Sequence, residues 1–382
     1  MNKLEIAEIR KQWTKEKATF DRICACYVDD DKTKTYVGRD AFFSLPEEEI
    51  FKYLEIFRKA TAGQIGRNLV NLEFPREEEM EGGAQAFLLK LRNSALSDDA
   101  LLDQFYDLVI ANYETAEKYY IVLAHAVYDI PGKSSAGDFM EDASDNLYDY
   151  MICAICPVKL SKPGLGYNEA EGRIGERKRD WVVEEPDKAF LFPAYTDRTA
   201  NIHEVLYYSH KPEELMPEFS EALFGKSAPA SAGTQKELFD TLVAESLGEE
   251  ATLATVQAVQ EEITEILEAN KDQPEPPVLG KGDIRRLLSR SGVSDEQLEQ
   301  TFDRSFDELA GSPDEEIVVT NLAAAKRFTV KTPDIDIHVK PESAGLIENK
   351  MVEGQLCIVI PITGDIEVNG IPVRAAIRTG EE

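Results

Sequence analysis

The sequence predicts an α+β protein, with a mainly antiparallel sheet and packed helices in an N-terminal domain, then a helical segment and a small β-rich C-terminal unit. Three observations lead to this prediction. Strand-like runs of aromatic, Ile, Val and Cys residues recur through the first 210 residues and are interrupted by helical apolar spacing. Helical spacing then continues alone over 235–310. From residue 316 onward, short apolar runs are separated by Gly, Pro and Asn-Gly turns.

Helices and strands alternate in the first 130 residues. The clearest helix begins at Pro46 and Glu47, where a capping box that includes Ser44 is expected, and its apolar side chains repeat at helical spacing up to Gly63. In order, the expected elements are a helix over 4–14, strands over 22–28 and 35–43, a helix over 44–63, an apolar run over 69–74, a helix over 100–113 and a strand over 119–130.

The central stretch, residues 145–210, alternates apolar strand-like runs with loops that carry most of the unusual polar residues. The run over 148–160 is rich in aromatic, Ile, Cys and Val residues and is closed by Pro163 and Gly164. Such a run is typical of a strand deep in a sheet. Further strand-like runs are expected over 189–195 and 202–208, followed by a helix over 212–224.

Composition predicts the domain boundaries. The sequence KSAPASAGT is small and flexible in character, so it separates an N-terminal domain from the rest of the chain. The domains are an α+β domain over 1–225, a linker over 226–234, a helical segment over 235–310 and a small β-rich unit over 311–382. Within them we expect helices over 235–247, 253–269, 283–290 and 294–309, and strand-rich stretches over 316–322, 327–339, 346–362 and 365–373.

The chain is strongly acidic, with 42 Lys and Arg against 72 Asp and Glu and a net charge of -30. Its long-range field therefore repels phosphate backbones and anionic membranes, and any contact with nucleic acid needs a local basic patch. The first residues form a charged amphipathic pattern without a signal-peptide core, and no later run is long enough for a transmembrane helix. We expect a cytoplasmic protein that does not enter a membrane.

Five cysteines lie in apolar strand-like runs, which favours reduced, buried thiols over a disulfide framework. Cys153 and Cys156 have the CxxC spacing of zinc ligands, and Cys24 with Cys26 could supply a second pair. In a strand, however, a spacing of three residues sends side chains to opposite faces. Structural thiols are therefore the favoured interpretation.

Four aspartates, Asp138, Asp142, Asp145 and Asp149, recur at spacings of four, three and four residues. They would share one face if this stretch were helical. Clustered carboxylates repel one another unless a divalent cation or a basic partner neutralises them, so Mg²⁺ or Mn²⁺ binding is one interpretation. A solvated acidic face is the simpler one in so acidic a chain.

The loop over 159–179 reverses the charge of the chain locally, with six basic residues against three acidic ones. The basic residues are Lys159, Lys162, Arg173, Arg177, Lys178 and Arg179. Together with Tyr167 and Trp181, they could bind phosphates or stack on a base. The alternative is that they pair with the protein's own acidic surface.

No catalytic residue is assigned. His203, Asp197 and Ser209 include the residue types of a hydrolase triad, but no nucleophile elbow surrounds any serine. A structural histidine is the favoured interpretation of His203.

Several stretches of this chain resemble a known family. ICPVKLSKPGLGY, RDWVVEEPDKAFLFPAYTDR and NIHEVLYYSH are similar to the signature stretches of DUF4317, a family of uncharacterised Firmicutes proteins. RICACYV and LPEEEIFKYLEIFRK also resemble that family, so the resemblance covers nearly the whole chain. Its name implies no activity. In layout alone, the domain order and the final DIEVNGIPV are similar to bacterial nucleoid-associated proteins of the YejK type.

The sequence therefore favours a non-enzymatic binding or assembly protein that contacts nucleic acid or another polyanion through the basic loop. The alternative is a metal-dependent phosphoesterase or nuclease-like enzyme that uses the carboxylates of 138–149. No cofactor is predicted for the first function, and the second would need Mg²⁺ or Mn²⁺. A homo-oligomer, the ligand and the reaction are left open. The two functions differ in whether the carboxylates and the basic loop meet in one pocket.

Overall fold

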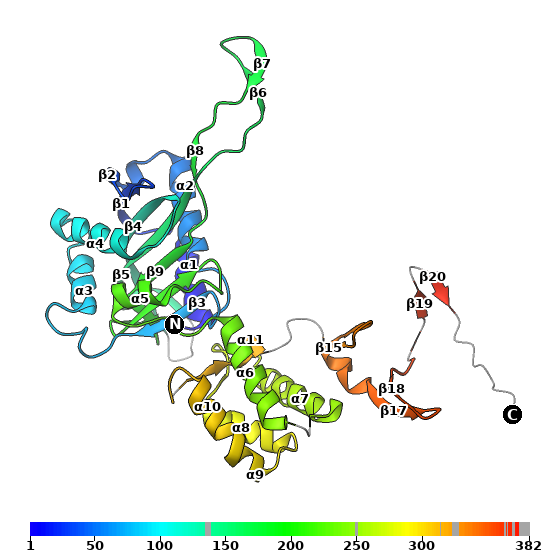
Figure 1. The fold of residues 1–382 in the computed structure, drawn as a ribbon. Coiled ribbons are helices and arrows are strands. Elements are labelled where there is room, and N and C mark those ends of the chain that lie inside the picture. Colours follow the sequence, from blue (N-terminus) through cyan, green and yellow to red (C-terminus); the bar gives the residue numbers. More distant parts are fainter. Residues whose placement is uncertain are drawn as a thin grey trace. The chain divides into compact units, whose positions relative to one another are not determined.

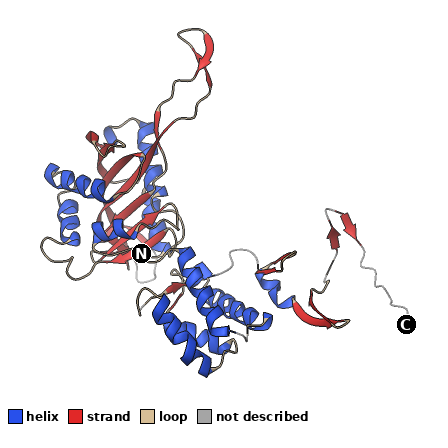
Figure 2. Ribbon diagram, viewed as in Figure 1, coloured by secondary structure: helices blue, strands red, loops and turns tan. Residues whose placement is uncertain are grey.

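The computed structural model describes residues 1–133, 139–248, 251–313, 315–322, 328–362, 364, 366–368 and 371–373. The chain is an α+β protein with a mainly antiparallel sheet, as predicted (Figures 1 and 2). It divides into two compact units. The first consists of Met1–Thr234 and Gln273–Pro276, and the second consists of Gln235–Asp272 and Pro277–Glu382.

The first unit is built on an eight-stranded sheet with the order β2-β1-β4-β5-β9-β12-β3, in which β8 also pairs with β5 (Figure 2). All of its strand pairs are antiparallel. The strands are β1 (Phe20–Val28), β2 (Lys34–Ala41), β3 (Leu69–Glu73), β4 (Lys118–Lys133), β5 (Phe139–Leu160), β8 (Trp181–Val183), β9 (Lys188–Phe192) and β12 (Glu204–Ser209). A short hairpin of β10 (Ala194–Thr196) and β11 (Thr199–Asn201) lies between β9 and β12 in the chain.

Helices cover both faces of this sheet. One apolar core joins the sheet to α1 (Lys3–Gln12) and α2 (Glu47–Lys59). A second core, on the other face, joins it to α3 (Ala84–Asn93), α4 (Asp99–Asn112) and α5 (Pro217–Phe224). Because successive strand residues point to opposite faces, the central strands need apolar side chains at nearly every position. This explains the continuous apolar run that marked 148–160 in the sequence.

The pairing of β4 with β5 is the longest in the protein and runs from Lys118↔Val158 to Lys133↔Phe139. It extends β5 well before the expected start at residue 148. The helix considered for 138–149 is therefore wrong over 139–149, and Asp138 lies outside the described residues. Pairing with β4 overrides the helical spacing of the aspartates, because paired strands satisfy each other's backbone groups, although register shifts at Pro131 leave Asp142 and Asp145 without a paired residue.

The start of α2 also differs from its prediction. The N-cap is Pro46, which has no side chain that could cap the helix, and Ser44 donates its hydroxyl to the carbonyl oxygen of Ala41 at 2.7 Å. The expected capping box is therefore wrong, because Ser44 closes the preceding 3-10 turn, η1 (Phe42–Ser44), instead. Three acidic residues in the first turn of α2 favour its start through the helix dipole.

Two further elements were not predicted. Helix α3 follows the acidic tract of 77–81 and buries Leu88 and Leu91 against the sheet. In the stretch 316–322, expected to be a strand, only β14 (Ile317–Val318) is extended, and α11 (Val319–Leu322) follows directly.

The second unit begins with helices and ends with hairpins. Its main core contains Phe239, Ile284, Phe302 and Phe306. No helix of the described residues has the length and apolar character needed to cross a membrane. The elements are α6 (Ala232–Leu247), α7 (Leu253–Ala269), β13 (Val278–Leu279), α8 (Lys281–Arg290), α9 (Asp295–Gln297), η3 (Leu298–Phe302), α10 (Asp303–Leu309), β14, α11, β15 (Phe328–Lys331), β16 (Asp336–Val339), η4 (Pro341–Leu346), β17 (Glu348–Val352), β18 (Gln355–Val359), β19 (Ile366–Val368) and β20 (Ile371–Val373).

The predicted linker, residues 226–234, lies within the first unit and is partly packed. Ala228 is buried and its N–H donates to the Ser220 hydroxyl at 2.6 Å, and α6 already begins at Ala232. The later segment over 273–276 belongs to the first unit, where the N–H of Lys3 donates to the Pro274 carbonyl oxygen at 3.3 Å. Hydrogen bonds and burial therefore tie down much of what composition alone marks as linker.

All five cysteines are free, and four of them are buried. Cys153 lies in the core against α3, α4 and α5, together with Cys24 and Cys26, whereas Cys156 lies in the core on the opposite face. The prediction of reduced, mostly buried thiols is confirmed. A zinc ion shared by all four is excluded, because the sheet separates Cys156 from the other three.

We predict that Cys357 reacts first when the native protein is treated with a thiol reagent near pH 8. It is half-buried, whereas burial raises the pKa of Cys153 well above its usual value and that of Cys26 to about 11, which suppresses the reactive thiolate. Mass spectrometry of timed samples measures the order, and labelling after denaturation gives the total. Fast native labelling of Cys153 would contradict the burial described here.

Candidate functional site

An extended hairpin leaves the sheet at the end of β5 and returns at the start of β8 (Figure 1). We call residues 159–180 the arm. Its tip, residues 165–176, is the hairpin of β6 (Leu165–Asn168) and β7 (Arg173–Glu176), and its stem is residues 159–164 and 177–180. The basic loop of the sequence analysis is therefore a projecting β arm.

Hydrogen bonds between its two sides hold the stem together. The N–H of Ser161 donates to the Asp180 carbonyl oxygen at 2.8 Å, and the Asp180 N–H donates to the Ser161 hydroxyl at 3.1 Å. Farther out, the Arg177 N–H donates to the Gly164 carbonyl oxygen at 2.9 Å. These cross-links make the stem a paired ribbon that carries the tip.

Three of the arm's six basic side chains have polar partners. Lys159 pairs with Glu117 at 3.1 Å, and Arg173 pairs with Glu171 at 2.6 Å. Arg179 donates from Nε to the Ser161 carbonyl oxygen at 2.7 Å. Both ion pairs are half-exposed and add little stability in water. The expectation that the loop pairs with the protein's own acidic residues therefore holds for only part of it.

The other three basic side chains, Lys162, Arg177 and Lys178, form no ion pair within the described part of the chain. All three belong to the stem. All three side chains are exposed. The stem thus presents cations that remain available to an external anion.

Trp181 stands at the base of the arm, where sequence reasoning placed it beside the basic residues. Its ring is half-exposed, and the Lys118 ammonium lies 4.9 Å from the ring centre in a cation–π contact. Lys118 also contacts Asp29, and this hydrogen bond raises the pKa of Lys118. The sequence missed Lys118 because only the β4–β5 register places it beside the arm.

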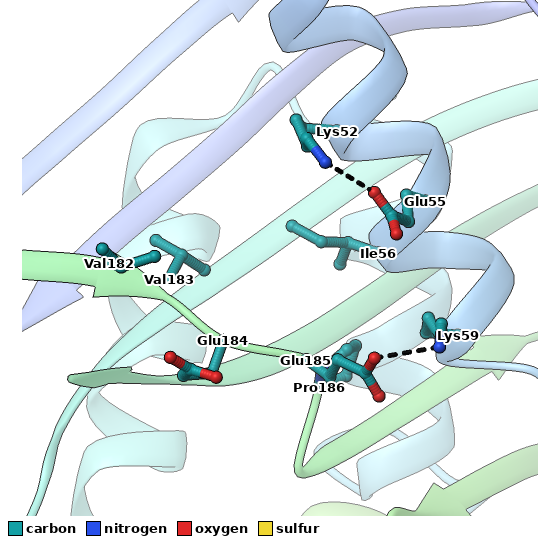
Figure 3. A pocket seen from close by; sticks show the side chains of 9 residues that line it. All are labelled: Lys52, Glu55, Ile56, Lys59, Val182, Val183, Glu184, Glu185 and Pro186. Atoms are coloured by element: carbon teal, nitrogen blue, oxygen red, sulfur yellow. Dashed lines mark hydrogen bonds and ion pairs between the residues drawn. The ribbon is translucent and has the colours of Figure 1, made fainter. Parts of the chain in front are cut away.

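A shallow hollow lies on the α2 side of the arm's base (Figure 3). Ile56, Val182 and Val183 form its apolar surface, and the ion pairs Lys52–Glu55 and Lys59–Glu185, each at 2.9 Å, flank it. Its volume is about 220 Å³, which is below the roughly 300 Å³ at which small-molecule pockets begin. It fits a side chain of a partner better than a small substrate.

The tip has two different faces. Directly paired residues of an antiparallel ladder share a face, so the pair Tyr167↔Ile174 lies on the same side as Leu165. These three apolar side chains are 63%, 61% and 79% exposed, respectively. That face also carries Glu176, the partner of Leu165, at the base of the tip, whereas the opposite face carries the pairs Gly166↔Gly175 and Asn168↔Arg173. The tip is therefore largely apolar on one face, and these apolar side chains are exposed.

Of the four candidate metal ligands, only the side chain of Asp149 is described. Asp142 and Asp145 lie in β5, but their side chains, like all of Asp138, are outside the described part of the structure. The structure therefore does not bring the four carboxylates together as one described cluster.

The Asp149 carboxylate is already engaged. Its Oδ1 lies 2.7 Å from His125 Nε2, and its Oδ2 lies 4.0 Å from Arg92 Nε. His125 is buried on β4 and also contacts Asp21 at 3.2 Å. Burial of Asp149 acts to raise its pKa, but the hydrogen bond and attraction of His125, together with Arg92, outweigh it and hold the pKa below its usual value. His125 and Arg92 thus stabilise this carboxylate from within the fold.

Asp149 and the arm do not form one site. Asp149 lies in β5, and Leu160, at the end of that strand where the arm begins, is eleven positions farther along the chain. At a rise of roughly 3.3 Å per residue, the two positions are about 36 Å apart along the strand. The Asp149 carboxylate and the arm therefore do not share a pocket.

Another acidic group lies at the turn between β1 and β2. Asp29, Asp30 and Asp31 bring carboxylate oxygens within 4.8 Å of one another. Lys118 contacts both Asp29 and Asp30, and its hydrogen bond lowers the pKa of Asp29. The Lys118 ammonium thus offsets part of the repulsion among the three carboxylates.

The triad residue types do not meet. His203 Nδ1 lies 2.6 Å from Glu79, and its ring is more than half exposed. The buried Ser209 donates to the carbonyl oxygens of Lys211 and Glu214 at 2.8 Å. His203 and Ser209 therefore each have a local structural partner.

Comparison with known proteins adds one finding. Residues 1–371 match the family model described as "Domain of unknown function (DUF4317)". No curated protein and no solved structure matches the chain significantly. The likeness in layout to YejK-type nucleoid-associated proteins is therefore not supported.

We predict that Asp149→Asn lowers the free energy of unfolding at pH 7 by about 1 kcal/mol, a small value because the carboxylate is 40% exposed. The lowered pKa of Asp149 gives stability that is present above the unfolded value near 3.8 and is lost as pH falls through the folded value. The difference between wild type and variant should therefore shrink below about pH 4. Urea titrations at pH 7 and pH 3.5 measure it.

The matched control is Asp129→Asn, an exposed aspartate on β4. It should have little effect at either pH. A thermal stabilisation by Mn²⁺ that disappears in Asp149→Asn but not in Asp129→Asn would restore the metal-dependent alternative.

Proposed function

The chain belongs to the DUF4317 family, and we propose that it is a non-enzymatic cytoplasmic binding protein that contacts nucleic acid through the stem of its arm. The description of the family assigns no activity. The proposal rests instead on the arm, which combines projection from the sheet with local positive charge.

The single observation that carries the proposal is the set of unpaired cations. Lys162, Arg177 and Lys178 lie close together on a narrow ribbon, without an ion pair among the described residues. Lys and Arg in such a position release counterions from phosphates when they bind a nucleic-acid backbone. Arg177 can also form two parallel hydrogen bonds to one phosphate.

The net charge of -30 limits how such binding could work. The averaged field repels a polyanion, but screening restricts interactions at physiological salt to about 8 Å. A cation on a projecting arm can meet a phosphate while most of the acidic surface stays beyond that distance. Projection therefore offsets the unfavourable charge of the whole chain.

A cytoplasmic location agrees with the free cysteines, because reducing compartments keep thiols unpaired. The metal-dependent alternative gains no support from the described residues. Its one described carboxylate, Asp149, already contacts His125, and it lies far from the cations of the arm.

We predict weak, salt-sensitive binding of the full chain to oligonucleotides. Three neutralised phosphates give a slope of log affinity against log salt of about -2 for single strands and about -2.7 for duplexes. Replacing Lys162, Arg177 and Lys178 by Ala should flatten the slope and abolish binding at low salt. Fluorescence anisotropy at several salt concentrations measures both quantities, and heparin in place of DNA or RNA tests another polyanion.

The control removes the same charge elsewhere in the first unit. Lys3, Lys11 and Lys17 are exposed lysines in or beside α1, and their replacement by Ala makes the net charge equally more negative. This variant should keep the slope of the wild type. Equal losses in both triple variants would show that net charge, and not the arm, governs binding, and no binding at low salt would end the proposal.

A further inference from the structure

We propose that the arm also pairs with the arm of a second copy of this chain, antiparallel and with the apolar faces of the two tips in contact. This inference goes beyond nucleic-acid binding. It starts from the apolar tip, which a contact with phosphates does not explain.

The apolar face of the tip is the first argument. Leu165, Tyr167 and Ile174 lie on one side of a hairpin that has no apolar neighbour among the described residues. Their side chains are 61% to 79% exposed. A two-stranded hairpin alone is marginally stable in water, and packing of its apolar face against another surface stabilises it. The tip therefore has the character of an element that is completed by a partner.

The charges of the arm indicate which partner fits. The tip carries Glu169, Glu171 and Glu176 against Arg173, a net charge of -2. The stem has the opposite sign, with a net charge of +4. Its charged residues are Lys159, Lys162, Arg177, Lys178, Arg179 and Asp180. One arm thus contains both halves of a complementary pair.

An antiparallel arrangement of two arms uses this pattern twice. It lays the two β6–β7 hairpins against each other through their apolar faces, so that the acidic turn of each tip, with Glu169 and Glu171, reaches the start of the other copy's stem. β6 and β7 are each four residues long, or roughly 13 Å when extended, so the two hairpins can overlap over their whole length. The contact is self-complementary, as a two-fold interface requires.

The alternative occupants fit the pattern less well. A nucleic acid would satisfy the stem but would meet the acidic carboxylates of the tip. The acidic surface of another copy's body would satisfy the stem and repel the tip. Only a partner that presents negative charge to the stem and positive charge to the tip complements both parts of the arm. A second arm in antiparallel orientation does so.

The experiment measures self-association of the full chain by analytical ultracentrifugation from micromolar to millimolar concentration. Two charge-reversal variants are compared with the wild type. The tip variant is Glu169→Lys with Glu171→Lys, which makes the tip +2 and leaves Glu176 on the apolar face unchanged. The stem variant is Lys162→Glu, Arg177→Glu and Lys178→Glu, which makes the stem -2. All five side chains are at the arm's surface, so folding, checked by circular dichroism, should be retained.

Wild type is expected to shift from monomer toward dimer as concentration rises. Each variant alone should dimerise about tenfold or more weakly, because it places like charges together at both ends of the interface. An equal mixture of the two variants should regain the dimer, since each tip then meets a stem of opposite sign. Tyr167→Ser with Ile174→Ser should also weaken the dimer, whereas Tyr36→Ser with Val37→Ser, two exposed residues of β2, should not.

A monomer at every concentration, or a mixture that does not regain the dimer, would overturn the proposal.

Failure of arm pairing can be distinguished from failure of the proposed nucleic-acid binding. A monomer that binds oligonucleotide with the expected salt slope refutes only arm pairing, and a dimer without oligonucleotide binding refutes only the nucleic-acid contact. Because both ligands use the stem, oligonucleotide should also shift the dimer toward monomer.

Discussion

The antiparallel pairing of β4 with β5 is the constraint on which the rest of the first unit depends. It spans sixteen residue pairs through the middle of the sheet, and helices cover both of its faces. Each residue of β5 between Tyr148 and Cys156 is therefore buried on one side or the other, except Asp149. Burial of successive apolar residues, each contributing roughly 1.5–3 kcal/mol, fixes the register, because a shift by one residue would exchange the two cores.

The same strand explains where polar chemistry is found. At Asp149, a break in the apolar series is accommodated by His125 on the neighbouring strand, which satisfies the carboxylate within the fold. At Leu160 neither β4 nor β9 pairs with the strand any longer, so the chain continues into the arm with only its own return strand as partner. On the arm, by contrast, cations without an ion pair among the described residues occur together with exposed apolar side chains.

The arm differs from the sheet in its length, its exposure and the division of its charge between a Glu-rich tip and a Lys- and Arg-rich stem. A ribbon of this kind can exchange one partner for another, since nucleic acid and a second arm would compete for the same cations.

The sequence by itself determined the α+β class, the deep strand over 148–160, the reduced thiols and the basic segment, because apolar periodicity and local composition follow directly from burial. It also placed Cys153 and Cys156 on opposite faces, since alternation is a property of any strand. Only the tertiary structure decided that residues 139–149 extend β5 and that the basic loop is a hairpin with an apolar face. It also decided that His125 pairs with the Asp149 carboxylate and that the Lys118 ammonium lies over the Trp181 ring. The physical reason is that each of these depends on which strand lies beside another, and pairing between distant segments has no signal in local spacing.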